Sequence, residues 1–86
     1  MDWVLRSKLE GHVDSVWCVA VAADGSLAIT GGFKGDVRVW DLKSGKCIKQ
    51  LAGHTGQVWA VALSPDSAIA VSAGADATVR IWQLFE

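Results

Sequence analysis

The chain alternates apolar and polar residues in short runs that are typical of β-strands. In residues 76–82, Val79 and Ile81 would face one side of an extended segment and the residues between them the other side. This follows because side chains alternate with a period of two along a strand. The same pattern occupies residues 36–40. Both segments end on a tryptophan, so we expect two equivalent strands.

The whole pattern recurs at one spacing. Trp40 and Trp82 lie 42 residues apart, and so do the pairs Gly11-His12 and Gly53-His54. Aligning residues 9–44 with residues 51–86 gives identity at 14 of 36 positions, far more than chance allows. A period of 40 to 45 residues with a Gly-His pair and a Trp-Asp pair is typical of a propeller blade built from four short strands.

Turn residues divide each cycle into predicted strands. The glycines at 31 and 32 are expected to end the strand before them. The predicted strands are 3–9, 15–21, 27–30, 37–40, 46–51, 57–63, 68–72 and 78–84. Three units follow: an outer strand completing a neighbouring blade (1–9), a first cycle (10–51), and a second cycle that lacks its outer strand (52–86).

Composition narrows the class of protein. Of the 86 residues, 51% are hydrophobic, which is too many for a disordered chain. No apolar run approaches the 18 or so residues that span a membrane, and the first residues lack the pattern of a signal peptide. We therefore expect a soluble cytoplasmic protein. The net charge of −1 and the dispersed Lys and Arg argue against binding to nucleic acid or membrane.

The cysteines give no cross-link or metal motif. Cys18 and Cys47 are too few and too far apart for a disulfide framework or a zinc site. Apolar residues, Ala60 and Leu5, stand 42 places away from them. Two buried free thiols are expected.

These motifs together give a family resemblance over the whole length. The Gly-His pairs, Ser64-Pro65-Asp66, Trp40-Asp41 and the run 72–82 resemble the WD-repeat β-propeller family. The second cycle departs from the family pattern at Gln83, where Asp is usual. The resemblance implies an all-β fold whose four-stranded antiparallel blades close into a ring.

The resemblance also implies a hydrogen-bonded tetrad of His, Ser or Thr, Asp and Trp in each blade. The second cycle matches it at His54, Ser72, Asp76 and Trp82, and the first at His12, Thr30 and Trp40. Lys34 stands where the first cycle should carry Asp, and Asp36 is two residues out of register. Since Lys cannot accept a proton from a histidine ring, we expect a weaker first network with Lys34 turned to solvent. Lys34→Asp is then expected to raise the melting temperature.

Catalysis is the weaker interpretation of the same residues. His54, Ser72 and Asp76 have the composition of a hydrolase triad, but a triad needs an exposed nucleophile and an oxyanion hole. Ser72 lies inside an apolar strand instead. The two histidines are equivalent residues of separate blades, without zinc-site spacing. The glycines near residue 32 lack the Lys-Ser/Thr partner of a phosphate loop. We predict no enzyme, no metal and no cofactor.

Aromatic residues supply a candidate partner surface. In WD-repeat proteins the positions of Trp17, Trp59 and Phe33 tend to lie on the top face near the central channel. They could simply fill the rim between blades, since large aromatics bury much area. They could also be hot spots for a peptide or protein. Polar neighbours that would add contacts are Ser15, Gln57 and Lys34.

Two blades cannot stand alone in this fold. Each blade is a sheet with two apolar faces, and at least three repeats are generally needed for stability. We expect a head-to-tail homo-oligomer, most simply four copies with eight blades, and three copies with six as the second choice. The predicted function is a non-enzymatic scaffold or protein–protein interaction module. The alternative is an engineered or excised two-blade fragment with a purely structural, self-assembling role and no ligand.

Overall fold

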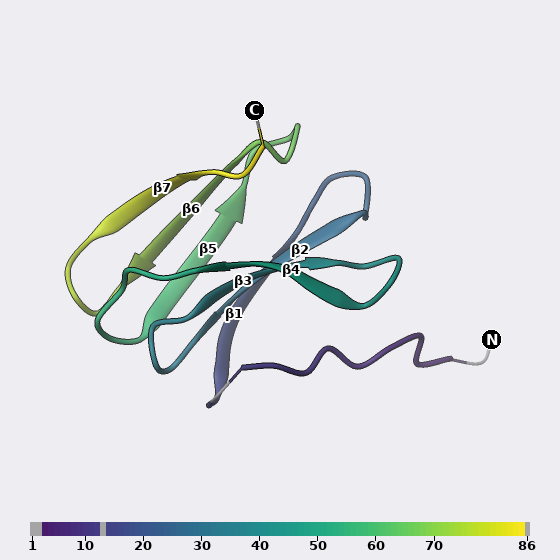
Figure 1. Ribbon diagram of the computed structural model, residues 1–86, viewed down its shortest axis with the longest axis horizontal. Coiled ribbons are helices and arrows are strands. Elements are labelled where there is room, and N and C mark those ends of the chain that lie inside the picture. The colour runs from purple at the N-terminus through teal and green to yellow at the C-terminus, as the bar shows by residue number, and fades with distance from the viewer. Residues whose placement is uncertain (1–2, 13, 86) are drawn as a thin grey trace.

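Two antiparallel sheets make up the protein (Figure 1). The structure, a computed structural model, describes residues 3–12 and 14–85. The first sheet has the order β1-β2-β3-β4 and the second β5-β6-β7. The strands are β1 (Val16–Val21), β2 (Leu27–Gly32), β3 (Val37–Asp41), β4 (Lys46–Leu51), β5 (Val58–Leu63), β6 (Ile69–Gly74) and β7 (Val79–Gln83). The prediction of an all-β chain with one four-stranded and one three-stranded blade is confirmed.

Two strands continue further than predicted. β2 and β6 run through Gly32 and Gly74, whereas the sequence had suggested that they end at residues 30 and 72. Gly31 explains the error for β2. A Cβ atom on Gly31 would lie 2.5 Å from Val58 Cγ1 and 2.8 Å from Cys18 Sγ. This glycine therefore permits close approach of a neighbouring strand and does not end its own.

The N-terminal segment forms no strand within the chain. Residues 3–12 lie beside the first sheet and run away from β7 (Figure 1). Trp3, Val4 and Leu5 are 94%, 81% and 79% exposed. The completion of a neighbouring blade by residues 1–9 stays a prediction. Residues 1–2, 13 and 86, which fall within the predicted units 1–9, 10–51 and 52–86, lie outside the described part of the chain.

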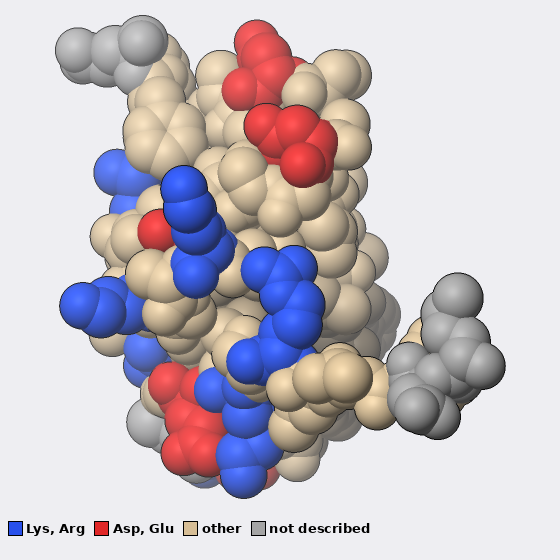
Figure 2. All heavy atoms as spheres, turned by 90° about the vertical axis from the view of Figure 1, so that its right-hand side faces the viewer, with Lys and Arg blue, Asp and Glu red and all other residues tan. Residues whose placement is uncertain are grey.

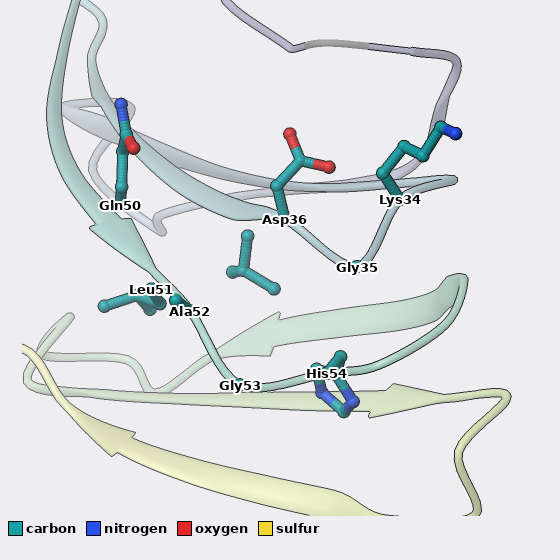
Figure 3. A pocket seen from close by; sticks show the side chains of 9 residues that line it. Lys34, Gly35, Asp36, Gln50, Leu51, Ala52, Gly53 and His54 are labelled. Atoms are coloured by element: carbon teal, nitrogen blue, oxygen red, sulfur yellow. The ribbon is translucent and has the colours of Figure 1, made fainter.

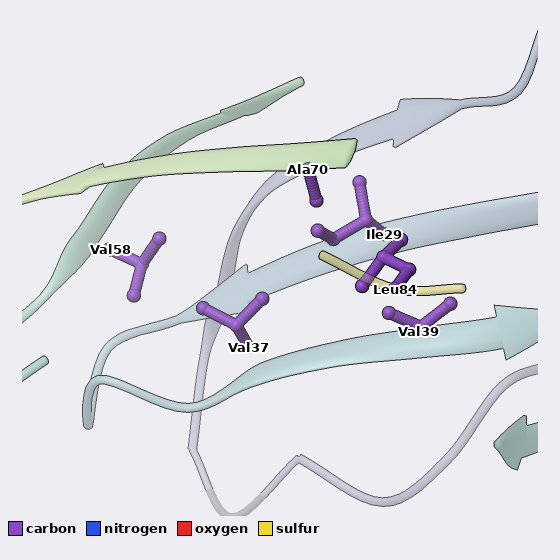
Figure 4. Packing of buried hydrophobic residues seen from close by; sticks show 6 residues of the cluster. All are labelled: Ile29, Val37, Val39, Val58, Ala70 and Leu84. Carbon is purple, nitrogen blue, oxygen red and sulfur yellow. The ribbon is translucent and has the colours of Figure 1, made fainter. Parts of the chain in front are cut away.

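The core lies between the two sheets, where β1 and β2 contact β5. Six buried residues fill it from both sides (Figure 4): Ile29, Val37, Val39, Val58, Ala70 and Leu84. Cys18 and Ala20 pack against this cluster from β1, and Val61, Leu63 and Trp82 pack from the second sheet. Each sheet thus buries one face against the other.

The opposite face of each sheet is left open. On β1, Val16, Val19 and Val21 are 53%, 62% and 58% exposed. On β7, Val79 and Ile81 are 67% and 74% exposed. These side chains alternate with the core residues along the same strands, so the two ends of the stack are both apolar.

Candidate functional site

A line of hydrogen bonds crosses the second blade. Trp82 Nε1 lies 2.9 Å from Ser72 Oγ, and Ser72 Oγ lies 2.8 Å from His54 Nε2. The other ring nitrogen, His54 Nδ1, lies 3.1 Å from Asp76 Oδ1. The structure therefore brings together the four residues predicted to form the second tetrad.

Donor and acceptor chemistry fixes the direction of this line. The indole of Trp82 can only donate, and the ionised carboxylate of Asp76 can only accept. With a neutral imidazole, Ser72 accepts from Trp82 and donates to His54 Nε2, and His54 Nδ1–H donates to Asp76. A neutral imidazole satisfies every bond. The network joins β6 and β7 to the loop before β5.

Asp76, the one acid of this network, accepts hydrogen bonds from further donors. Its Oδ1 accepts from the Thr78 hydroxyl at 2.7 Å, and its Oδ2 accepts from the backbone N–H of Thr55 at 3.2 Å. The Thr78 hydroxyl first, and then His54 and the backbone donors, hold the pKa of Asp76 well below its usual 3.8. The carboxylate therefore remains ionised at neutral pH.

The first blade contains an equivalent network, and it corrects the expectation about its acid. Trp40 Nε1 donates to Thr30 Oγ1 at 2.8 Å, and Thr30 Oγ1 lies beside His12 Nε2. His12 Nδ1 pairs with Asp36 Oδ2. Asp36 supplies the carboxylate, so the predicted lack of one in this blade was wrong. Lys34 is exposed, as predicted, and takes no part.

Thr78 shows why a carboxylate at position 36 can reach the ring. Asp36 and Thr78 are repeat-equivalent, and Thr78 Oγ1 already lies 3.4 Å from His54 Nδ1. An Asp side chain at the same position therefore reaches the histidine directly. The available clue was that Asp36 is the one carboxylate in the turn formed by residues 33–36.

Arginine side chains pack over the Gly-His pairs. A Cβ atom on Gly53 would lie 2.9 Å from Arg80 Nη1, and one on Gly11 would lie 3.1 Å from Arg38 Nη1. Arg38 Nε is also 3.6 Å from Asp36 Oδ2. Each glycine thus leaves room for a guanidinium beside the network, which explains the Gly-His pairing.

This arrangement does not suit nucleophilic catalysis. Ser72 is fully buried, at 0% exposure, and its hydroxyl donates to His54 while accepting from Trp82. A substrate cannot approach an oxygen in that position. Over residues 3–12 and 14–85, no three His, Cys, Asp or Glu side chains are grouped as metal ligands would be.

Some residues of the predicted aromatic surface lie in contact with one another. The rings of Trp17 and Phe33 lie 5.3 Å apart at an angle of 60°, and both are exposed. Trp59 is 59% exposed and its Nε1 donates to Gln57 Oε1 at 3.2 Å. Ser15 and Lys34 are exposed as well. The structure pairs Trp17 with Phe33 and Trp59 with Gln57.

A hollow of about 200 Å³ lies where the first blade passes into the second (Figure 3). Lys34, Gly35 and Asp36 line it from the β2–β3 turn, and residues 50–54 line it from the end of β4 and the linker that follows. His54 borders it, yet both ring nitrogens are already engaged with Ser72 and Asp76. His54 therefore presents no free ring nitrogen to the hollow.

Charge is mixed on the face shown in Figure 2, where Lys and Arg cross the middle and Asp and Glu lie above and below. Neither sign dominates this face, in keeping with the net charge of −1. The described residues contain no helix with the length and apolar character needed to cross a membrane.

The fold, the period and the paired networks agree with the comparison to known families. Residues 3–41 and 45–83 both match the family described as "WD domain, G-beta repeat". The chain belongs to the WD-repeat family. Its two hydrogen-bonded networks join the residues that the family resemblance implied for each blade, with Asp36 added in the first.

The alignments with relatives cover about half of this WD-repeat chain. "Small ribosomal subunit protein RACK1y" of Oryza sativa subsp. japonica is 51% identical over 47 residues, which is 55% of this chain and 14% of that protein. "Protein groucho" of Drosophila melanogaster is 38% identical over 47 residues, 55% of this chain and 6% of that protein. "WD repeat-containing protein 18" of Rattus norvegicus is 40% identical over 40 residues, 46% of this chain and 9% of that protein. The matched part is thus a small fraction of each relative.

Proposed function

We propose that this WD-repeat chain is a non-enzymatic interaction module that self-assembles head to tail into a closed propeller. The observation that carries the proposal is the relation between its buried and its open faces. Each open face has a repeat-equivalent face that is already buried inside the chain. A second copy can therefore reuse an interface whose packing the chain itself contains.

The open face of the first blade matches the buried face of the second. Val16, Val19 and Val21 are exposed, and their equivalents 42 residues later are Val58, Val61 and Leu63. Those equivalents pack into the core, and Val58 is fully buried. The same apolar positions thus serve as contact residues in one blade and lie open in the other.

The open face of the second blade matches the buried face of the first. Val79 and Ile81 are exposed, while their equivalents Val37 and Val39 are both 0% exposed. Open apolar sheet faces of this kind mark association surfaces. Stacking the first blade of one copy on the second blade of another would bury both open faces at once.

Two residue differences between the blades offset each other in volume on the open face of the second blade. Cys18 opposes Gly31 in the first blade, and Ala60 opposes Ala73 in the second. A Cβ atom on Gly31 would meet the Cys18 sulfur at 2.8 Å. In the second blade, the added methyl group of Ala73 accompanies the loss of that sulfur at position 60. The open face is therefore composed as a packing surface.

Two blades per chain allow even-numbered rings when every blade is used. Propellers usually have four to eight blades. We propose four copies with eight blades, and three copies with six blades as the second choice. We also propose a cytoplasmic setting, because one relative is named as a small ribosomal subunit protein.

The decisive experiment is the native mass in solution, measured by light scattering over a range of concentrations. A mass of four or three chains supports the proposal. A compact, cooperatively folding single chain at low concentration would overturn it. The open faces would then be covered in some other way, for instance by further blades of a longer chain.

A partner on the aromatic surface is the second part of the proposal. Trp17, Phe33 and Trp59 are exposed and carry the large amphipathic rings that dominate protein hot spots. Ser15, Gln57 and Lys34 would add polar contacts. A pull-down that compares the intact ring with Trp17→Ala/Trp59→Ala tests it. Equal capture by both would favour the purely structural, ligand-free assembly.

A further inference from the structure

We propose that Ala77 keeps a neighbouring copy about 1 Å further away than the two blades of one chain are from each other, and so weakens the contact between copies. The inference rests on the proposed self-assembly, because it concerns the junction at which two copies meet. It is argued from the equivalent turn of the first blade, where a glycine stands in place of Ala77.

The turn between β2 and β3 contacts the second blade at Gly35. Figure 3 shows Gly35 on this turn, facing the segment that carries His54. Gly35 is buried, and a Cβ atom on it would lie 2.5 Å from the His54 carbonyl oxygen and 2.9 Å from that of Gly56. Ordinary van der Waals contact of a Cβ atom begins at 3.4 Å. The glycine therefore lets the two blades of one chain approach more closely than any side chain would allow.

The turn between β6 and β7 has the same geometry but carries a methyl group. Ala77 stands 42 residues after Gly35. Ala77 N donates to the Gly74 carbonyl oxygen at 3.2 Å, as Gly35 N donates to that of Gly32 at 3.3 Å. Both residues have a positive φ, 66° for Ala77 and 91° for Gly35. The Ala77 methyl group therefore points where a Cβ atom on Gly35 would point.

This methyl group meets the next copy in a head-to-tail junction. Ala77 is exposed in the single chain. The carbonyl groups of His12 and Asp14 of the next copy would lie over it, because they stand 42 places before those that Gly35 meets. If two copies met as the two blades do, the methyl carbon would lie as close to the His12 oxygen as 2.5 Å. Restoring ordinary contact requires the copies to separate there by about 1 Å.

A second alanine acts at the same end of the junction. Ala73 is the equivalent of Gly31, on which a Cβ atom would lie 2.5 Å from Val58 Cγ1. Ala73 would therefore press on Val16 of the next copy, which is the equivalent of Val58. Val58 is the first residue of β5 and follows the loop that Gly35 contacts. Both extra methyl groups thus widen one end of the junction between copies.

Widening at one end lowers the strength of this contact. A gap of about 0.5–1 Å forfeits roughly a quarter to a half of the dispersion attraction between facing atoms. The junction inside the chain, with glycines at positions 31 and 35, has no such gap. An assembled ring therefore contains two kinds of junction in alternation, and it comes apart between copies before it comes apart within one.

Ser67 provides a matched control for the backbone of Ala77. Ser67 also has a positive φ, 61°, and its equivalent Gly25 has a φ of 76°. A Cβ atom on Gly25 would meet no atom within 4 Å. Position 67 therefore shares the unusual backbone conformation of Ala77 and lacks its contact with a neighbouring blade.

Ala77→Gly and Ser67→Gly are compared with the unchanged chain by analytical ultracentrifugation over a range of concentrations. The measured quantity is the concentration at which half of the chains are assembled. Ala77→Gly should lower it roughly tenfold, because the variant removes an overpacked contact. Ser67→Gly should leave it unchanged. Circular dichroism and urea unfolding check that both variants fold, as expected since glycine adopts a positive φ readily.

The outcomes separate this inference from the proposed function. No fall with Ala77→Gly, or an equal or larger fall with Ser67→Gly, would overturn the role of Ala77 and leave the assembly in place. An unchanged chain that stays monomeric would overturn the proposed function. Assembly of Ala77→Gly under those conditions would still support the inference, whereas a monomeric Ala77→Gly would overturn both.

Discussion

At the scale of single residues, the two blades build one hydrogen-bonded network in two ways. The carboxylate comes from Asp76 in the second blade and from Asp36 in the first, which occupies the position of Thr78. The histidine ring is the common requirement, because its Nδ1–H needs a buried acceptor. A carboxylate at position 36 in the first blade or at position 76 in the second can accept this hydrogen bond, since each lies next to the Nδ1 atom of its histidine.

Asp36→Ala should destabilise the native state, whereas Lys34→Ala should not. Removing the carboxylate leaves the buried His12 N–H unpaired, which costs about 1–3 kcal/mol. Lys34 is exposed, and its loss should change stability by no more than about 0.5 kcal/mol. Urea unfolding of the two variants measures both effects. Because Asp36 already serves His12, Lys34→Asp is no longer expected to raise the melting temperature.

Ser72→Ala should also destabilise the native state, by about 1–3 kcal/mol, because it leaves Trp82 N–H and His54 Nε2 without partners. Ser72→Thr is the matched control, since Thr30 makes both bonds in the first blade. Chemical denaturation compares them. Equal loss in both variants would mean that packing, and not the hydroxyl, sets the effect.

Asp76 should make stability depend on pH in the acid range. Its pKa is lowered in the folded state by Thr78 and His54, so the unfolded chain binds the proton more readily. The stabilisation is fully present above the ordinary pKa of 3.8 and is lost as the pH falls through the lower folded-state value. Unfolding measured between pH 7 and pH 2 should show this fall. Asp76→Asn should flatten it, and an unchanged slope would contradict the assignment.

At the scale of elements, the contact between β2 and β5 determines how closely the blades approach. Gly31 lies at this contact, against Val58 of β5 and beside Cys18 of β1. A glycine inside a strand weakens that strand, so its use here reflects packing. The equivalent contact in an assembled ring would involve Ala73 and Ala60.

Gly31→Ala should cost about 1–3 kcal/mol, because the new methyl group overlaps Val58 and the Cys18 sulfur. Adding Cys18→Ala should recover part of that loss, since it recreates the Ala-Ala pair of the second blade. A double-mutant cycle from denaturation data measures the coupling. Simple additivity of the two losses would show that the pair does not compensate.

At the scale of the whole molecule, the two open faces make this chain a two-ended unit. One end presents Val16, Val19 and Val21, and the other presents Val79 and Ile81. The ends differ, so in the proposed assembly the contact between copies would be head to tail and not self-complementary. Substitution of one end should therefore stop growth at that end alone.

Val19→Glu and Ile81→Glu should each abolish the closed assembly. Both side chains are exposed in the single chain, so the charge costs little until a second copy would bury it. A mixture of the two variants retains one intact pair of ends and should give a dimer and nothing larger. Analytical ultracentrifugation measures this. Ile48→Glu, on the edge strand β4, is the control and should leave the assembly intact.

Much was already determined by the sequence alone: the all-β class, the blade boundaries near residue 51 and the tetrad residues His54, Ser72, Asp76 and Trp82. The class and the boundary follow from strand periodicity and a fixed repeat, which are local properties of the chain, and the tetrad residues follow from the resemblance to the WD-repeat family. Tertiary structure alone decided that Asp36 serves His12 and that Gly31 lies within a strand. Both depend on which side chains meet across strands that are distant in sequence, and alignment of the repeats cannot measure that distance.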